Sequence, residues 1–406
     1  MNVFVIPSWY PSACQPIAGL FVRDQAEAVA LHRPDWNVVV GTWGHHDGAL
    51  SLRSPGASLR ALRWRQRRGS DSRWSTAGPM QVVQTPALSW TLAIAGGGAA
   101  GLLRASRCNF AQARQRFGRL DVMHAHVGFP AGWIAACLSV ETGVPYVLTE
   151  HMGPFPFAAL RTRSGAVWPA LRQAFDRAGA TIAVSDALAQ QLRDCGLPCS
   201  HVIPNVVDEQ RFRPVVAAAT ATATATARPF VFFTLGALTP QKGVDLLLRA
   251  LARWNPPRGE VELRIGGSGP LLSAHRALAA GLGIADRVRW LGAVAPEAAP
   301  GHFAACDAFV LASRHESFGV VLVEALMSGK PVIATRSGGP QTIVEADNGV
   351  LVDVGDVAGL AGAMSQLAAQ PGRFDAATIR SGALGRFSRA AVATQLVAVY
   401  ESVHSA

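Results

Sequence analysis

Lysine is almost absent from this sequence. Lys242 and Lys330 are the only two, so arginine carries nearly all the positive charge of a chain with a formal net charge of +10. Only 16% of the residues are charged and half are hydrophobic, which excludes an intrinsically disordered chain. A length of 406 residues is long for one hydrophobic core and suits two domains.

Cysteine is scarce and scattered. The six cysteines include no C-x-x-C pair, and Cys195 with Cys199 alone does not make a zinc site. We therefore expect all six thiols to be reduced, as in a cytosolic protein.

Segments that would direct the chain into a membrane are also missing. The start, MNVFVIPSWYP, has no basic residue and too short an apolar run for a signal peptide. The longest uncharged run, residues 85–103, approaches the ~20 residues that a transmembrane helix needs. Pro86 and a central Gly-Gly-Gly nevertheless oppose a stable helix there. We expect a cytoplasmic protein.

The positive charge is concentrated between Arg53 and Arg119. This region holds twelve arginines and one acidic residue, Asp71, for a net of +11, whereas the rest of the chain is net −1. Tryptophan, which favours membrane interfaces, is interleaved with these arginines at positions 64, 74 and 90. Such a region suits nucleic acid, anionic lipid or an acidic acceptor, or is simply a solvated surface.

Strand and helix patterns alternate along both halves of the chain. Short β-branched runs such as VFVIP and PVIAT are followed by amphipathic segments, which predicts two doubly wound parallel sheets in an α/β protein. The run AAATATATATA has no large side chain to bury and reads as a linker. We therefore divide the chain into a Rossmann-like domain at 1–210, a linker at 211–228, a second such domain at 229–385 and a terminal helix at 386–406.

Candidate ligand-binding residues of the first half follow its predicted strands. Gly19 stands between the first strand and a helix, where phosphates tend to bind. His124 and His126 end one strand and His151 follows another, and ligands bind at the carboxyl ends of parallel strands. An ordinary polar loop histidine is the alternative for each of the three.

The most informative segment is 312–352. Within ESFGVVLVEALMSGKPVIAT, Glu316 precedes a helix and a β-branched strand follows that helix. Glu324 is the only charged residue in the apolar helix, so it needs a partner, either ligand hydroxyls or a buried arginine. The N–H groups near Ser317 and Gly319 form a site for an anion or a polyhydroxyl ligand. The Glu316 carboxylate favours a sugar hydroxyl over a phosphate.

This segment resembles the signature of retaining glycosyltransferases of the GT-B fold, family 4, also called group 1 transferases. The resemblance implies two Rossmann-like domains facing across a cleft, with the terminal helix crossing back to the first. It implies that Glu316 holds the donor sugar together with the amides of Ser317, Phe318, Gly319 and Val320. It also implies that Glu324 holds the nucleotide ribose.

Further motifs carry the same resemblance. PSWYP and GLFVRDQA resemble the family's opening, which implies that Gly19 lies beside the donor diphosphate. TEHMG implies that His151 approaches the donor sugar, and GALTPQKG implies that Lys242 clamps the diphosphate. The sequence departs from the family at Ala237, commonly arginine, for which Arg314 is a candidate replacement, and at Thr342, often glutamate.

The implied activity is retaining hexosyl transfer from a nucleotide-diphosphate sugar to a glycan or lipid-linked glycan in cell-surface or exopolysaccharide biosynthesis. Glu316, His151 and Lys242 are the implied catalytic residues. No carboxylate pair of the hydrolase type and no Asp-x-Asp in a cleft position stands out, so we expect no catalytic metal and no cofactor. Residue types do not distinguish a UDP from a GDP donor.

We expect the arginine-rich region 53–119 to contact an anionic membrane surface at the inner face of the cell membrane, and we expect no nucleic-acid partner. Two alternatives remain. One is a nucleotide-sugar 2-epimerase of the same fold, which lacks support in the ESFG stretch. The other is a non-catalytic scaffold that binds a membrane or a glycan, for which Ala237 is the best argument.

Overall fold

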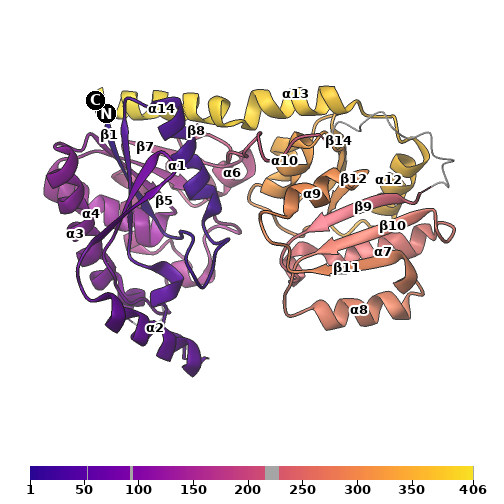
Figure 1. The fold of residues 1–406 in the computed structure, drawn as a ribbon, viewed down its shortest axis with the longest axis horizontal. Coiled ribbons are helices and arrows are strands. Elements are labelled where there is room, and N and C mark those ends of the chain that lie inside the picture. The colour runs from indigo at the N-terminus through magenta and orange to yellow at the C-terminus, as the bar shows by residue number, and fades with distance from the viewer. Residues whose placement is uncertain (53, 92–94, 215–227, 406) are drawn as a thin grey trace. The chain divides into compact units, whose positions relative to one another are not determined.

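The computed structural model divides the chain into two compact units (Figure 1). Met1–Val206 with Arg389–Ala406 forms the first unit and Val207–Ser388 the second. Residues 53, 92–94, 215–227 and 406 are outside the part that the structure describes. Most of the predicted linker, 211–228, therefore lies outside the described residues, and the chain enters the second unit before it, between Val206 and Val207.

The first unit is built on a sheet with the strand order β3-β4-β2-β1-β5-β6-β7-β8. Neighbouring strands are parallel except β3, which pairs with β4 as an antiparallel hairpin at the edge. The strands are β1 (Asn2–Pro7), β2 (Asn37–Thr42), β3 (Arg73–Ala77), β4 (Met80–Gln84), β5 (Val122–His126), β6 (Tyr146–Glu150), β7 (Ala180–Ala183) and β8 (His201–Val202).

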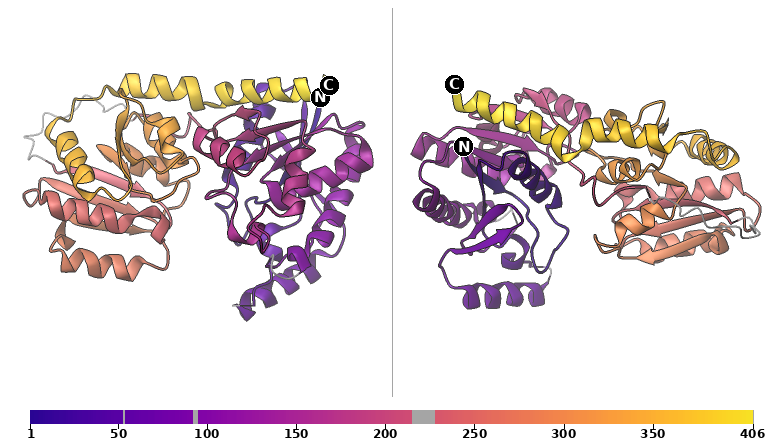
Figure 2. Two further views of the ribbon diagram at one scale, coloured as in Figure 1. Left: turned by 180° about the vertical axis from the view of Figure 1, so that it is seen from behind. Right: turned by 45° about the horizontal axis from the view of Figure 1, so that its top comes forward.

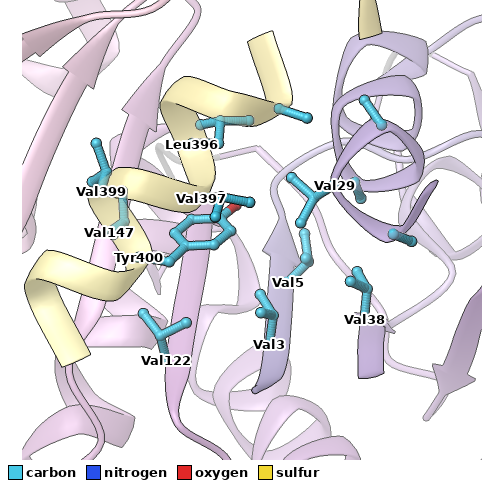
Figure 3. Close-up of a cluster of buried hydrophobic side chains, with 14 of the residues drawn as sticks. Val3, Val5, Val29, Val38, Val122, Val147, Leu396, Val397, Val399 and Tyr400 are labelled. Carbon is cyan, nitrogen blue, oxygen red and sulfur yellow. The ribbon is translucent and has the colours of Figure 1, made fainter. Parts of the chain in front are cut away.

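Helices cover both faces of this sheet because successive strand residues point to opposite sides. On one face, Val3 and Val5 of β1 join Val29, Val397 and Tyr400 in a buried cluster (Figure 3). On the other, Phe4 packs edge-on against Phe110. The helices are α1 (Leu20–His32), α2 (Pro55–Arg68), α3 (Ala99–Phe117), α4 (Trp133–Thr142), α5 (Pro169–Asp176), α6 (Asp186–Asp194) and α14 (Arg389–Ser405), with short turns η1 (His45–Gly48), η2 (Ala95–Gly98), η3 (Gly128–Gly132) and η4 (Ala158–Leu160).

The arginine-rich region 53–119 contains more regular structure than the sequence analysis assigned. It forms α2, the β3–β4 hairpin, η2 and α3. The uncharged run 85–103 becomes a loop, η2 and the first residues of α3, with 92–94 outside the description. Within the described residues, no helix combines the length and the apolar character needed to cross a membrane.

The second unit has a parallel sheet with the order β11-β10-β9-β12-β13-β14. Phe232 faces Trp254 of one helix layer while its neighbour Phe233 packs on Phe303 of the other, so helices lie on both sides (Figure 2). The strands are β9 (Phe230–Leu235), β10 (Val261–Gly266), β11 (Val288–Gly292), β12 (Ala308–Leu311), β13 (Val332–Thr335) and β14 (Gly349–Val352). The helices are η5 (Pro240–Lys242), α7 (Val244–Trp254), α8 (Leu272–Gly281), η6 (Ala285–Arg287), α9 (Ala299–Ala304), α10 (Val320–Met327), α11 (Pro340–Ile343), α12 (Val357–Ala369) and α13 (Ala376–Phe387).

Candidate functional site

Lys242 and Glu316 meet in the second unit. They follow β9 and β12, which are neighbours in the sheet, so both loops emerge at the same edge. Lys242 Nζ donates to Glu316 Oε2 at 2.5 Å, and Ser313 Oγ lies 3.3 Å from the same oxygen. The side chains are 25% and 13% exposed, so the pair is shielded yet accessible from one side.

Backbone contacts hold the two loops together at Gly243. This residue has φ +62°, and a Cβ there would lie 1.9 Å from the carbonyl oxygen of Ala312. Arg314 N–H donates to the Gln241 carbonyl at 2.7 Å, and Gln241 Nε2 donates to the His315 carbonyl at 3.1 Å. Only glycine fits this position, so the packing explains the glycine that follows Lys242.

The loop after β13 fixes Glu316 from a third direction. Glu316 N–H donates to the Ser337 carbonyl at 2.9 Å, and Gly339 N–H donates to the Glu316 carbonyl at 2.7 Å. Residues 316 and 338 form an isolated parallel bridge. The backbone of Glu316 is therefore bound on both sides, so its carboxylate is presented from a fixed position.

Helix α10 carries the remaining donor-site candidates. It begins after Gly319, at which φ is +101°, and buries Leu322, Val323, Ala325, Leu326 and Met327. Val320 and Glu324 are half-buried and, at i and i+4, share one side of the helix. Ser317 is half-buried and Phe318 is buried. Val320, Val321 and Glu324 therefore lie on the more open side of the helix.

Arg314 was the sequence candidate for the arginine that Ala237 lacks. Its guanidinium instead makes a two-pronged ion pair with Asp245 in the first turn of α7, at 2.7 and 2.8 Å, and donates to the Pro240 carbonyl at 2.8 Å. This pairing lowers the pKa of Asp245. Arg314 is committed to α7, and we do not assign it the role of the missing arginine.

Gly19 and His151 belong to the first unit and lie close together there. Gly19 has φ +73°, and a Cβ on it would lie 2.2 Å from the carbonyl oxygen of Trp9. Phe21, in the first turn of α1, packs on the His151 imidazole with ring centroids 4.4 Å apart. The start of α1 and the end of β6 therefore meet through these two rings.

His151 is one end of a chain of buried histidines. His126 Nδ1 lies 3.0 Å from His151 Nε2, and the His124 and His126 rings are 4.0 Å apart. His124 in turn contacts the Tyr400 hydroxyl at 2.6 Å and Thr149 Oγ1 at 2.7 Å. Burial lowers the pKa of all three, to about 3 for His124 and His151. The three imidazoles are therefore neutral at pH 7.

Glu150 is a buried carboxyl that the sequence analysis passed over. One of its oxygens accepts from the N–H groups of His151 and Met152, and the other from the Gly128 N–H, each at 2.9 Å. Burial raises its pKa to about 7, against the opposing effect of these hydrogen bonds. Glu150 ties the loops after β5 and β6 together and so fixes the backbone that bears His151.

An aromatic cavity of about 300 Å³ opens at the carboxyl end of the first sheet. Trp9 and Trp43 come from the loops after β1 and β2, Phe129 and Met152 follow β5 and β6, and Trp90 closes another side. Flat aromatic walls suit the apolar faces of a sugar or a lipid. Nothing in the sequence predicts a cavity at these residues, because it is the order of the strands in the sheet that brings them together.

The tryptophans of the arginine-rich region are packed into the first unit. Trp74 lies edge-on to Phe117 and under the guanidinium of Arg116, 4.6 Å from its ring centre. Trp64 and Trp90 are half-buried, and Trp90 lines the aromatic cavity. All three tryptophans are half-buried, and their place at a membrane interface stays a prediction.

No cluster of three or more histidine, cysteine, aspartate or glutamate side chains in the described part of the chain is arranged to hold a metal ion.

Both halves of this chain are similar in sequence to known protein families. Residues 90–211 match the model of Glycosyltransferase Family 4, and residues 221–382 match that of Glycosyl transferases group 1. The D-inositol 3-phosphate glycosyltransferase of Geodermatophilus obscurus is 34% identical over 310 residues, which are 71% of this chain and 68% of that protein. The chain belongs to the group 1 glycosyltransferases.

Other proteins are similar over shorter lengths or in fold alone. The GDP-mannose-dependent alpha-(1-6)-phosphatidylinositol monomannoside mannosyltransferase of Mycolicibacterium smegmatis is 35% identical over 182 residues, 42% of this chain and 47% of that protein. The structure of Anabaena HepE in complex with UDP superposes with a TM-score of 0.69 at 22% identity, over 99% of both chains. The predicted GT-B fold class is thereby confirmed for this glycosyltransferase.

Proposed function

We propose that this glycosyltransferase moves a hexose from a nucleotide-diphosphate sugar to a glycan or lipid-linked glycan, with retention of configuration, in the biosynthesis of a cell-surface or exported polysaccharide. The observation that carries the proposal is the 2.5 Å contact between Lys242 Nζ and Glu316 Oε2 at the start of α10. Transfer requires that the charge on the departing diphosphate be stabilised, and a preorganised ammonium group does this electrostatically.

In this proposal the donor diphosphate displaces Glu316 from Lys242. The freed Glu316 carboxylate then accepts hydrogen bonds from the donor sugar, and the N–H groups of residues 317–320 at the helix start bind the sugar or its phosphate. Glu324, one turn along the same side of α10, accepts from the ribose hydroxyls. One side of α10 thus binds both the sugar and the nucleoside of the donor.

The acceptor hydroxyl attacks the anomeric carbon from the face that the diphosphate leaves. The bond from that carbon to the diphosphate oxygen breaks as the bond to the acceptor oxygen forms, and the acceptor proton passes to the leaving phosphate. His151 is neutral and contributes a hydrogen bond to the sugar rather than a charge. Gly19 permits the close turn beside which the diphosphate is placed. The aromatic cavity offers stacking surfaces for the acceptor.

Similar proteins differ in the nucleotide base of the donor that their names give. HepE is described with UDP and with UDP-glucose, whereas the Mycolicibacterium smegmatis relative is GDP-mannose-dependent. We propose a screen of UDP- and GDP-hexoses with a polyprenyl- or inositol-lipid extract, followed by NMR of the product. A new glycosidic bond with the anomeric configuration of the donor supports the proposal. An inverted linkage contradicts retention, and an epimerised nucleotide sugar without transfer favours the 2-epimerase alternative.

We also propose that catalysis needs no divalent metal, because the Lys242 ammonium and the N–H groups of α10 supply the charge that a metal would otherwise provide. Turnover in excess EDTA is expected to equal turnover in untreated buffer. Loss of activity on chelation, restored by Mg²⁺, would show that leaving-group stabilisation has been assigned to the wrong group.

A peripheral position on the inner face of the cell membrane is the further part of this proposal. Helix α2 exposes Leu59 and Leu62, each 49% accessible, among arginines, and such a helix suits an anionic lipid surface. We expect co-sedimentation with anionic but not neutral vesicles, weakened by salt and by charge reversal at Arg63, Arg65, Arg67 and Arg68. Absence of sedimentation at low salt would remove the membrane assignment and leave the transferase assignment intact.

A further inference from the structure

Arginines make up half of the residues that line a second cavity of the first unit. It has a volume of about 510 Å³ and lies between α2 and the chain segments at residues 13–14 and 47. Helix α2 contributes five of its lining residues, which are Arg60, Arg63, Trp64, Arg67 and Arg68. We call this cavity the arginine pocket.

The arginines converge because α2 is seated by its other residues. Ala61 is buried, and the Trp64 ring lies against the turn at η1, where a Cβ on Gly44 or Gly48 would come within 2.1 or 3.1 Å of it. With Trp64 fixed inward, residues three and four positions away fall on the same side of the helix. That geometry places Arg60, Arg67 and Arg68 around the tryptophan.

The positive charge of the arginine pocket is poorly balanced by the protein. No salt bridge within the described residues involves any of its four arginines. Asp47 is the one acidic residue that lines the pocket, and its Oδ1 accepts from the Cys14 N–H at 2.9 Å. Four guanidinium groups around one carboxylate leave a local excess of three positive charges, which favours a multiply charged anion.

The arginine pocket adjoins the aromatic cavity through a single turn. In η1, His46 lines the aromatic cavity and the next residue, Asp47, lines the arginine pocket. Trp64 packs against this turn from the arginine side. The two cavities therefore lie next to each other, with η1 between them.

We propose that the arginine pocket binds a phosphoryl group of the acceptor, a phosphate monoester or a diphosphate. This rests on the proposed function, since it names the chemistry of the acceptor, and it separates two phosphate sites. The donor diphosphate goes to Lys242 in the second unit, and the acceptor phosphate goes to α2 in the first. Guanidinium forks bind phosphate oxygens in pairs, and a dianion or higher charge matches the local excess.

Calorimetric titration with inorganic pyrophosphate tests the pocket without any turnover. Wild type is expected to bind two pyrophosphates, and the double variant Arg63→Gln/Arg67→Gln is expected to weaken binding at the arginine pocket at least 10-fold while the Lys242 site remains. The variant Lys242→Met is expected to retain one pyrophosphate site. Arg104→Gln/Arg289→Gln removes the same charge from exposed positions outside the pocket and is expected to bind like the wild type. Circular dichroism checks that each variant is folded.

Vesicles distinguish a free from a lipid-borne phosphate. The vesicle probes are phosphatidylcholine with phosphatidic acid, which carries a monoester phosphate, or with phosphatidylglycerol at matched charge, which carries only a diester. Binding of pyrophosphate that depends on Arg63 and Arg67 supports a pocket open to soluble esters, and dependence seen with phosphatidic acid but not with phosphatidylglycerol or pyrophosphate supports a lipid phosphate. Binding of pyrophosphate and of phosphatidic acid that the Arg63/Arg67 variant leaves unchanged, or binding of neither by the wild type, overturns the proposal. If these probes bind as expected but no nucleotide sugar is turned over, the pocket stands and the proposed function fails.

Discussion

Replacement of Lys242 by methionine is expected to slow sugar transfer by about two to three orders of magnitude. Methionine keeps most of the aliphatic stem but removes the ammonium group that contacts Glu316 at 2.5 Å. Loss of one preorganised group that stabilises developing charge typically costs ~10²–10³ in rate. Loss of nucleotide affinity adds to that at subsaturating donor.

The chain supplies its own matched control for this variant. Lys330 is the only other lysine and lies after α10, where its N–H donates to the Ala325 carbonyl. Lys330→Met makes the same chemical change, and the rate of sugar transfer is expected to stay within ~2-fold of the wild type, as for a substitution away from the site. The readout is initial rate at saturating donor, with a melting curve for each variant. Equal rates for the two variants would remove Lys242 from the catalytic machinery.

Gly243→Ala is expected to disrupt the second unit at the candidate site. The added Cβ would lie 1.9 Å from the Ala312 carbonyl oxygen, and the residue must also keep φ at +62°. The left-handed backbone alone costs ~1–3 kcal/mol, and the collision with backbone atoms adds to it. The loops that bear Lys242 and Glu316 are then forced apart, so donor binding falls together with stability.

Gly259→Ala separates the cost of the left-handed backbone from the cost of the collision with backbone atoms. Gly259 has φ +85° in the same unit, but a Cβ there meets nothing within 4 Å. The measurement is the free energy of unfolding by denaturant, with nucleotide binding followed in parallel. We expect a loss of ~1 kcal/mol for Gly259→Ala and at least ~3 kcal/mol for Gly243→Ala. Similar losses would mean that the close approach to Ala312 does not constrain the site.

The strand–helix alternation was predictable because parallel strands are buried on both faces and read as β-branched runs. VFVIP, VVVG and PVIAT all became strands. Helix α2 was not predicted, because only Ala61 of its fourteen residues is buried and the helix therefore has no apolar stripe. The edge strand β3 has the sequence RWSTA and buries none of its residues, so it has no hydrophobic pattern that would predict a strand.

Contacts between distant residues could not be read from the sequence. Lys242 and Glu316 are 74 positions apart and meet only because β9 lies beside β12. His124 reaches Tyr400 across 276 positions through the return of α14 to the first unit. The motifs therefore predict which residues belong to the site, whereas the order of the strands determines which of these residues are in contact. The arginine pocket likewise needed the placement of Trp64 against η1.

The measurement that tests the account most directly is calorimetric titration of the wild type and Glu324→Ala with UDP and GDP. Glu324 is half-buried on the open side of α10, and the account assigns it the ribose hydroxyls. A carboxylate that accepts from ribose contributes ~1.5–3 kcal/mol, so the dissociation constant of the preferred nucleotide should rise at least ~10-fold. Glu316→Ala removes the sugar contact and also the carboxylate that the diphosphate displaces from Lys242, so it should bind the free nucleotide at least as well as the wild type. Unchanged affinity in Glu324→Ala, or no binding of either nucleotide by the wild type, would contradict the central claim that α10 and its flanking loops hold the donor.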